Sequence, residues 1–317
     1  MLSLHKLAGE IAAYFADDPT YQDSALQSFY FDVLLFLRLT ELQVPHSLFD
    51  VKLGGSPAES LLCIRNVVPG PLLKDRWVAA QSVTLFSATL SPRQYLQDML
   101  GLPDTTAWVD VPSAFDASQL QVHVARDIST RYHHRRQSLG QLVNTVAQQY
   151  ANAPGNYLAF FSSFDYLQMV ADELMASHPD IVVWLQSRSM NEADRDAFLA
   201  RFTVQGQGIG FAVLGGAFGE GIDLPGNCLI GAFIATLGMP QMNPVNENIR
   251  QRLHACVGHG HDYTYLFPGI QKVVQAAGRV IRTPQDKGVV FLMDDRFARP
   301  EVQRLLPAWW QAPEPLQ

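Results

Sequence analysis

The feature that most constrains the fold is a regular alternation of short apolar runs with amphipathic segments. Apolar residues at helical spacing fill several intervals between the runs, for example at 139–150 and 164–177. Strands that are joined by helices run parallel, because each crossover returns the chain to the same end of the sheet. We therefore predict an α/β fold, a mostly parallel sheet with helices on both faces. The predicted strands are the apolar runs at 120–125, 157–161, 181–185, 209–214 and 228–234.

The N-terminal third follows a different pattern. Apolar residues at helical spacing predict two helices, at 4–17 and 23–42, that do not belong to the sheet. A break follows at 54–57, where two glycines and a proline lie close together. The next segment is predicted to contain a short strand at 61–65, a helix within 69–80 and a buried strand at 83–86.

Two hydroxyl-bearing stretches precede predicted helices. Ser87 and Thr89 follow the last of these strands and are candidate caps for the helix that Pro92 opens. Further along, Ser189 and Glu192 have the spacing of a capping box, which predicts the start of another helix.

A glycine-rich loop at 215–226 joins two of the predicted strands. Glycines permit positive φ and let a ligand approach main-chain amides closely. Within this loop, Asp223 is a candidate acceptor for a sugar hydroxyl, and Glu220 would brace the loop or an arginine. A dinucleotide-binding fingerprint is excluded, because the glycine spacing differs and no long helix follows directly.

Arginines end the following helical segment, predicted at 269–282. Arg279 and Arg282 are three residues apart and would share one face, with Gln275 one turn upstream. Two planar guanidinium forks on one face suit a polyanion, including phosphate charge that grows in a transition state. The alternative is a solvated helix end with basic residues in its last turn.

Other hydroxyl and basic residues have two interpretations. Ser162 and Ser163 follow the predicted strand at 157–161, where they would either contact a nucleic-acid phosphate or cap the next helix. Residues 131–136 hold three arginines and two histidines, which would either contact phosphate or lie in solvent at a helix start.

These blocks together resemble, in order, motifs of the XPD/DinG branch of superfamily 2 DNA helicases. The resemblance spans roughly residues 60–300. It implies a RecA-like fold in three parts: a helical, arch-like remnant at 1–57, the C-terminal part of a first motor domain at 58–115, and a second RecA-like helicase domain at 116–317. The alternative for the N-terminal helices is an unrelated helical cap. The blocks are Ser87-Ala88-Thr89-Leu90-Ser91-Pro92, Phe160-Phe161-Ser162-Ser163, Glu220-Gly221-Ile222-Asp223, Gln275 to Arg282, and Gly288 to Phe297.

The resemblance also implies roles for individual residues. Two arginines and a glutamine would act in ATP hydrolysis, three loop residues would contact the nucleotide, four residues would bind single-stranded DNA, and a hydroxyl pair would couple the two sites. In that order they are Arg279, Arg282 and Gln275; Asp223, Glu220 and Gly221; Phe161, Ser162, Ser163 and Gly216; and Ser87 and Thr89.

The phosphate-binding side of an ATP site is missing from the sequence. No Gly-x-x-x-x-Gly-Lys-Ser/Thr loop occurs, and no acidic box occurs that would hold magnesium. ATP and Mg²⁺ would therefore be shared with a missing N-terminal half, and this chain alone would be inactive as an ATPase. The alternative is a non-catalytic nucleic-acid-binding or scaffold protein that retains a helicase C-terminal fold.

Composition limits the remaining classes. The net charge of −7 argues against a broad basic surface, so any contact with single-stranded or forked DNA must be local. Three scattered cysteines cannot hold the four-cysteine iron–sulfur cluster that many relatives carry, and no metal site is expected at His254, His259 and His261. Without an 18-residue apolar run, we expect a cytoplasmic protein with no membrane partner, and we expect a monomer.

Overall fold

The computed structural model describes residues 2–17, 23–42, 47–56, 59–219, 221–310 and 314–315. The chain gathers into two compact units, each assembled from segments that are distant in the sequence. Unit 1 comprises residues 1–85, 93–106 and 243–260, and unit 2 comprises residues 86–92, 107–242 and 261–317. The predicted three-part division at residues 57 and 115 stays a prediction.

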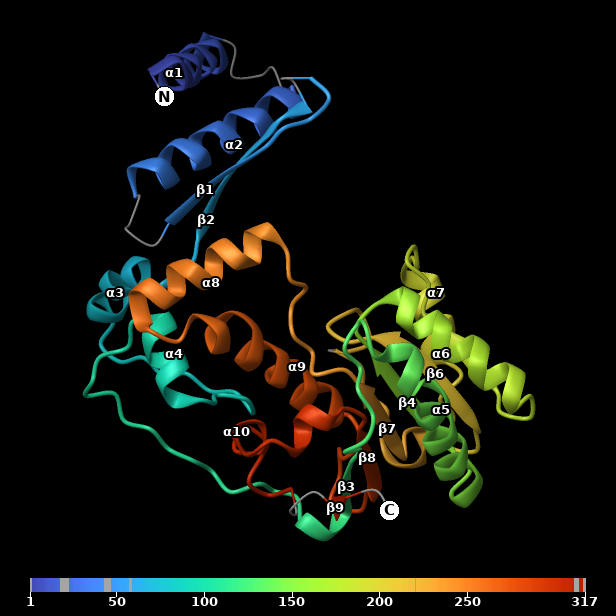
Figure 1. The fold of residues 1–317 in the computed structure, drawn as a ribbon. Coiled ribbons are helices and arrows are strands. Elements are labelled where there is room, and N and C mark those ends of the chain that lie inside the picture. The colour runs from blue at the N-terminus through green and yellow to red at the C-terminus, as the bar shows by residue number, and fades with distance from the viewer. Residues whose placement is uncertain are drawn as a thin grey trace. The chain divides into compact units, whose positions relative to one another are not determined.

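Unit 1 consists of helices and a two-stranded antiparallel hairpin (Figure 1). α1 packs against α2 through the buried side chains of Ala8, Val33 and Leu37. α3 and α4 contact each other, and Trp77 Nε1 donates a hydrogen bond of 2.9 Å to the Leu100 carbonyl oxygen. The elements are α1 (Leu2–Asp17), α2 (Ser24–Glu41), β1 (Ser47–Lys52), β2 (Leu61–Asn66), α3 (Gly70–Ala79), α4 (Arg93–Leu100) and α8 (Pro244–Val257).

Unit 2 contains a sheet in which every pairing between described strands is parallel. The strand order is β5-β6-β4-β7-β8-β3-β9, so consecutive strands are connected by crossovers. This sheet and its helices confirm the predicted α/β, RecA-like class. The elements are β3 (Leu120–Val124), α5 (Arg135–Asn152), β4 (Asn156–Phe161), α6 (Phe164–Ser177), β5 (Val183–Leu185), α7 (Glu192–Leu199), β6 (Gly208–Val213), β7 (Gly231–Ala235), α9 (Phe267–Ala277), β8 (Gly288–Leu292), α10 (Pro300–Gln303) and β9 (Glu314–Pro315).

Side-chain alternation along β4 explains the two layers of helices. Leu158 and Phe160 point into a core that includes Val273 of α9, whereas Tyr157 and Phe161 point into a second core with α5 and α6. All six residues of β4 are buried, as expected for a central parallel strand that is covered on both faces. Among the described residues, no helix has the length and apolarity that crossing a membrane requires.

The strand predicted at 83–86 is wrong. These residues form no strand in the structure, and Val83, Leu85 and Phe86 are exposed. A strand requires a neighbour for its main-chain hydrogen bonds, and none of the described strands pairs with this segment. An apolar run therefore did not suffice to form one.

Two predicted helix boundaries also differ. α9 ends at Ala277 rather than continuing to 282, because the amides of Arg279 and Val280 bond to carbonyls three residues back. The cap of α7 is Asn191, whose side chain accepts from the Asp194 amide at 2.9 Å, rather than the predicted Ser189. Both ends are set by local hydrogen bonds that the apolar spacing does not encode.

Candidate functional site

Two arginines converge on one carbonyl oxygen of the glycine-rich loop. Arg279 Nη1 donates to the Ile222 oxygen at 3.0 Å, and Arg282 Nη2 donates to the same oxygen at 2.9 Å. Arg282 Nε also lies 3.5 Å from Asp223 Oδ1. The structure therefore brings three of the predicted residues together, although the arginines follow α9 instead of sharing its face.

Alternating burial in the loop explains why Asp223 points outward. Ile222 and Leu224, on either side of Asp223, are buried in the core of unit 2, whereas the Asp223 side chain is 76% exposed. Upstream, Phe218 is buried and stacks on Phe198 with ring centroids 4.1 Å apart. Apolar anchors on both sides of the glycines thus fix the loop and leave its carboxylate accessible.

A buried carboxylate, missed in the sequence, shapes the turn that carries Arg282. Asp286 Oδ2 accepts from the amides of Arg282 at 2.7 Å and Thr283 at 2.8 Å, and its Oδ1 accepts from the Thr283 hydroxyl at 2.6 Å. Burial would raise the pKa of Asp286, but these bonds and one from the Gly226 amide outweigh burial and lower it. Asp286 therefore remains ionised and ties the arginine turn to the end of the glycine loop.

This arginine cluster, defined as Asp223, Arg279 and Arg282, lies at the amino-terminal edge of the sheet. Asp286, which binds the Arg282 amide, comes directly before β8, and Gly226 comes shortly before β7. Gln275 lies in the last turn of α9 and is partly buried, while Gly221 adopts a φ of 72° in the loop. Glu220 lies outside the described residues.

The residues predicted to bind single-stranded DNA lie at the opposite edge of the sheet, where the carboxyl ends of the β-strands meet. Phe161 at the end of β4 pairs with Val213 at the end of β6, so the residues that follow these two strands are neighbours. Ser162 is exposed, and Gly216 lies in the loop after β6. Phe161 is itself buried in the core, so its side chain is not on the surface. Its carbonyl oxygen accepts from the Leu214 amide at 2.9 Å.

Ser163 caps α6, because its hydroxyl accepts from the Tyr166 amide at 3.3 Å. This contact agrees with the capping alternative, while the exposed Ser162 hydroxyl accepts from Arg135 Nη2 at 2.7 Å. Lys272 of α9, missed in the sequence, lies against the glycine loop: a Cβ built at Gly215 would be 3.2 Å from its Cδ. The carboxyl edge therefore carries a hydroxyl group and cationic groups.

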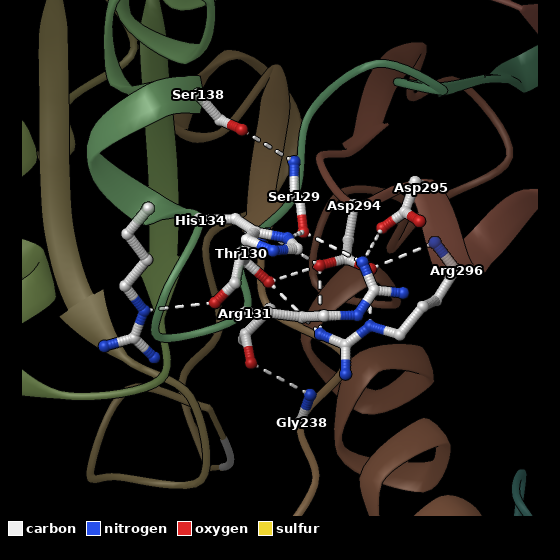
Figure 2. Close-up of polar contacts among 11 residues, drawn as sticks. Ser129, Thr130, Arg131, His134, Ser138, Gly238, Asp294, Asp295 and Arg296 are labelled. Atoms are coloured by element: carbon white, nitrogen blue, oxygen red, sulfur yellow. Dashed lines mark hydrogen bonds and ion pairs between the residues drawn. The ribbon is translucent and has the colours of Figure 1, made fainter.

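A fully buried carboxylate holds the loop between β3 and α5 in place (Figure 2). Asp294, after β8, accepts from the Thr130 amide at 2.9 Å and from Arg296 Nε at 2.6 Å and Nη2 at 2.9 Å. The Thr130 hydroxyl also donates to Asp294. Burial would raise the pKa of Asp294, but the hydrogen bonds and charge of Arg296, with the Thr130 bond, lower it. Beside this group, Arg131 pairs with Asp295 at 2.7 Å.

The predicted coupling residues are attached to α9. The Ser87 and Thr89 hydroxyl oxygens are 3.3 Å apart, and Gln271 Nε2 donates to the Ser91 carbonyl oxygen at 3.2 Å. Gln271, which was not singled out in the sequence, precedes Gln275 by one helical turn. The same helix therefore contacts the 87–91 segment and leads into the arginine cluster.

The chain is similar in sequence to a known domain family and to known helicases. The family model of the helicase C-terminal domain matches residues 146–313. The ATP-dependent DNA helicase XPD of Sulfolobus acidocaldarius is 25% identical over 225 residues, which cover 68% of this chain and 39% of that protein. The 3'-5' exonuclease DinG of Bacillus subtilis is 26% identical over 242 residues, which cover 72% of this chain and 25% of that protein.

Solved structures share the fold. The structure called XPD_APO aligns with a TM-score of 0.67 at 20% identity, covering 96% of this chain and 61% of that one. The structure of S. tokodaii Xpd4 aligns with a TM-score of 0.60 at 17% identity, covering 98% of this chain and 59% of that one. The chain spans 31%, 39% and 24% of three curated relatives, so it corresponds to only part of each.

Proposed function

We propose, from the premise that this chain belongs to the helicase C-terminal domain family, that it supplies the second motor domain of an ATP-dependent DNA helicase. It is the C-terminal portion of an XPD/DinG-type superfamily 2 helicase. The observation that carries the proposal is the convergence of Arg279 and Arg282 on the Ile222 carbonyl beside Asp223.

In this proposal, the arginine cluster completes an ATP site from the side opposite to the phosphate-binding loop. Arg279 and Arg282 would stabilise charge on the γ-phosphate, and Asp223 would accept from the nucleotide sugar. A missing N-terminal half would supply the phosphate loop and the carboxylates that hold Mg²⁺. This chain alone therefore hydrolyses no ATP.

The carboxyl edge would bind the phosphates of single-stranded DNA. The exposed Ser162 hydroxyl and the cation of Lys272 are groups that bind phosphate without reading base sequence. The Gly216 amide already donates to the Val213 carbonyl oxygen at 3.0 Å, so Gly216 would contribute by letting the strand approach the loop closely. The helix α9 would link this surface to the arginine cluster. Closure of the two motor domains on ATP would then change the affinity of this surface for single-stranded DNA.

Salt-dependent binding tests this surface. Fluorescence anisotropy with labelled oligo-dT is expected to show weak binding by this chain, with little difference between base sequences. The logarithm of affinity should fall with the logarithm of salt concentration by about 0.7 for each phosphate contacted. Equal affinity at low and high salt would contradict contact with phosphates. No binding at all would contradict the proposed DNA-binding surface at the carboxyl edge of the sheet.

Asp286 is predicted to position Arg282. Asp286→Ala removes the acceptor of four hydrogen bonds, so the turn should shift and ATP turnover of the full-length protein should fall about 10²-fold, the scale of a small misplacement. Asp286→Asn keeps one acceptor oxygen and should lose less. Asp180→Ala, which removes an exposed carboxylate, is the control. Near-normal turnover of folded Asp286→Ala protein would contradict this role.

A further inference from the structure

Arg135 carries a positive charge that the described carboxylates do not neutralise by a hydrogen bond. Its Nε donates to the Thr130 carbonyl oxygen at 3.0 Å and its Nη2 to the Ser162 hydroxyl at 2.7 Å, and both acceptors are uncharged. The neighbouring arginines differ, because Arg131 pairs with Asp295 and Arg296 with Asp294. Arg135 can therefore still bind an anion.

The surroundings of Arg135 make an anion favourable. Its guanidinium lies 4.4 Å from the centre of the Tyr166 ring, and burial of the group lowers its pKa. An arginine remains protonated despite such a shift, so the charge is partly removed from water without a full counter-charge. A phosphate next to the Ser162 hydroxyl would supply the counter-charge through charge-assisted hydrogen bonds with Arg135.

An exposed aromatic ring lies beside this cation. Tyr132 is 78% exposed, and the Arg135 guanidinium lies 5.6 Å from the centre of its ring. His133 meets the ring edge-on, with centroids 5.4 Å apart. A ring face that is open to solvent next to a cation is the arrangement on which bases of a single strand stack.

The loop that carries these residues is fixed from both sides. Buried Asp294 holds Thr130, while the Ser129 amide donates to the Ser138 hydroxyl at 3.0 Å (Figure 2). Ser129 Oγ also lies 3.2 Å from Nδ1 of His134. Little order would have to be gained on binding, because the loop is already held in one conformation.

We infer that Arg135 and Ser162 bind one backbone phosphate of single-stranded DNA and that Tyr132 stacks on the adjacent base. The inference rests on the proposed function. It chooses the phosphate-contact interpretation of the 131–136 segment, and it adds Tyr132 and Arg135 to Ser162, which the sequence motif had assigned. Stacking on Tyr132 distinguishes single-stranded DNA from free phosphate as the ligand, because a phosphate without a base would not contact the Tyr132 ring.

Two substitutions in this chain test the pair. Tyr132→Ala should weaken binding of labelled oligo-dT about tenfold with an unchanged salt slope, since it removes stacking and no charge. Arg135→Gln should also weaken binding about tenfold and reduce the salt slope by about 0.7, since it removes one phosphate contact. Tyr132→Phe keeps the ring and should restore most of the affinity. Arg195→Gln removes an exposed charge on α7 and is the matched control.

The fluorescence of an oligonucleotide containing 2-aminopurine gives a second measurement. Unaltered protein should quench it by stacking, and Tyr132→Ala should abolish the quenching. Thermal unfolding of Tyr132→Ala should match that of unaltered protein, because the side chain is mostly exposed. If the unaltered protein binds oligo-dT, and Tyr132→Ala and Arg135→Gln bind it with the same affinity as the unaltered protein, this inference is overturned and the proposed function stands. If unaltered protein binds no strand, both are overturned.

Discussion

Replacing Arg279 or Arg282 by alanine in the full-length protein is expected to lower ATP turnover by about 10³-fold, the scale of an arginine finger. Each guanidinium would contact phosphate charge that is greatest in the transition state, so ATP affinity should fall much less than the rate. Lysine at either position should rescue little, because a point charge cannot reproduce the planar fork. Steady-state ATP hydrolysis in the presence of single-stranded DNA measures both effects.

The contacts with the Ile222 carbonyl require a control for stability. If the arginines only braced the loop, the alanine variants would lose thermal stability in proportion to their loss of turnover. We expect the melting temperature to change little while the rate falls. Arg195→Ala, which removes an exposed arginine on α7, should preserve the rate. Near-normal hydrolysis by both alanine variants would show that the cluster is structural.

Asp294→Asn is expected to destabilise unit 2 by about 3–5 kcal/mol, because it leaves the Arg296 charge buried without its partner. For a domain of this size, that loss lowers the melting temperature by roughly 10 °C. The asparagine has nearly the same shape, so packing is conserved and the lost charge dominates. Calorimetry or circular dichroism on this chain would measure the shift.

The adjacent carboxylate provides the control for Asp294. Asp295 and its partner Arg131 are each about a third exposed, so Asp295→Asn should cost about 1 kcal/mol or less. The folded-state pKa of Asp294 is lowered, so its contribution is fully present above its unfolded pKa of about 3.9 and is lost as the pH falls through the folded value. The difference in the free energy of unfolding between unaltered protein and Asp294→Asn should therefore become smaller only at acidic pH. Equal melting temperatures at neutral pH would contradict the role of the buried pair.

The central strands of the parallel sheet could be predicted because they are apolar and the segments between them are amphipathic, whereas β9, which consists of Glu314 and Pro315, was not predicted. The prediction of a strand at 83–86 was wrong although this run is also largely apolar, because no described strand provides partners for its main-chain hydrogen bonds. β1 was missed, since its pairing with β2 depends on a neighbour rather than on its own pattern. The family resemblance is confirmed by the match to the helicase C-terminal domain model.

The candidate site was predictable where a motif is contiguous. Asp223 and the two arginines were identified from two such blocks, and the structure joins them. The supporting residues were not predictable, because their contacts join distant segments. Arg135 meets Ser162 across 27 positions and Thr130 meets Asp294 across 164, and no local periodicity records such pairs.

DNA-stimulated ATP turnover, compared between the full-length protein and this chain alone, tests the central claim most directly. The account predicts turnover at about 1 s⁻¹ or faster for the full-length protein, within the typical enzyme range, and rising when single-stranded DNA is added. It predicts no turnover for this chain alone, with or without DNA. Turnover near 1 s⁻¹ by the purified chain, or none by the full-length protein with DNA and Mg²⁺, would contradict the account.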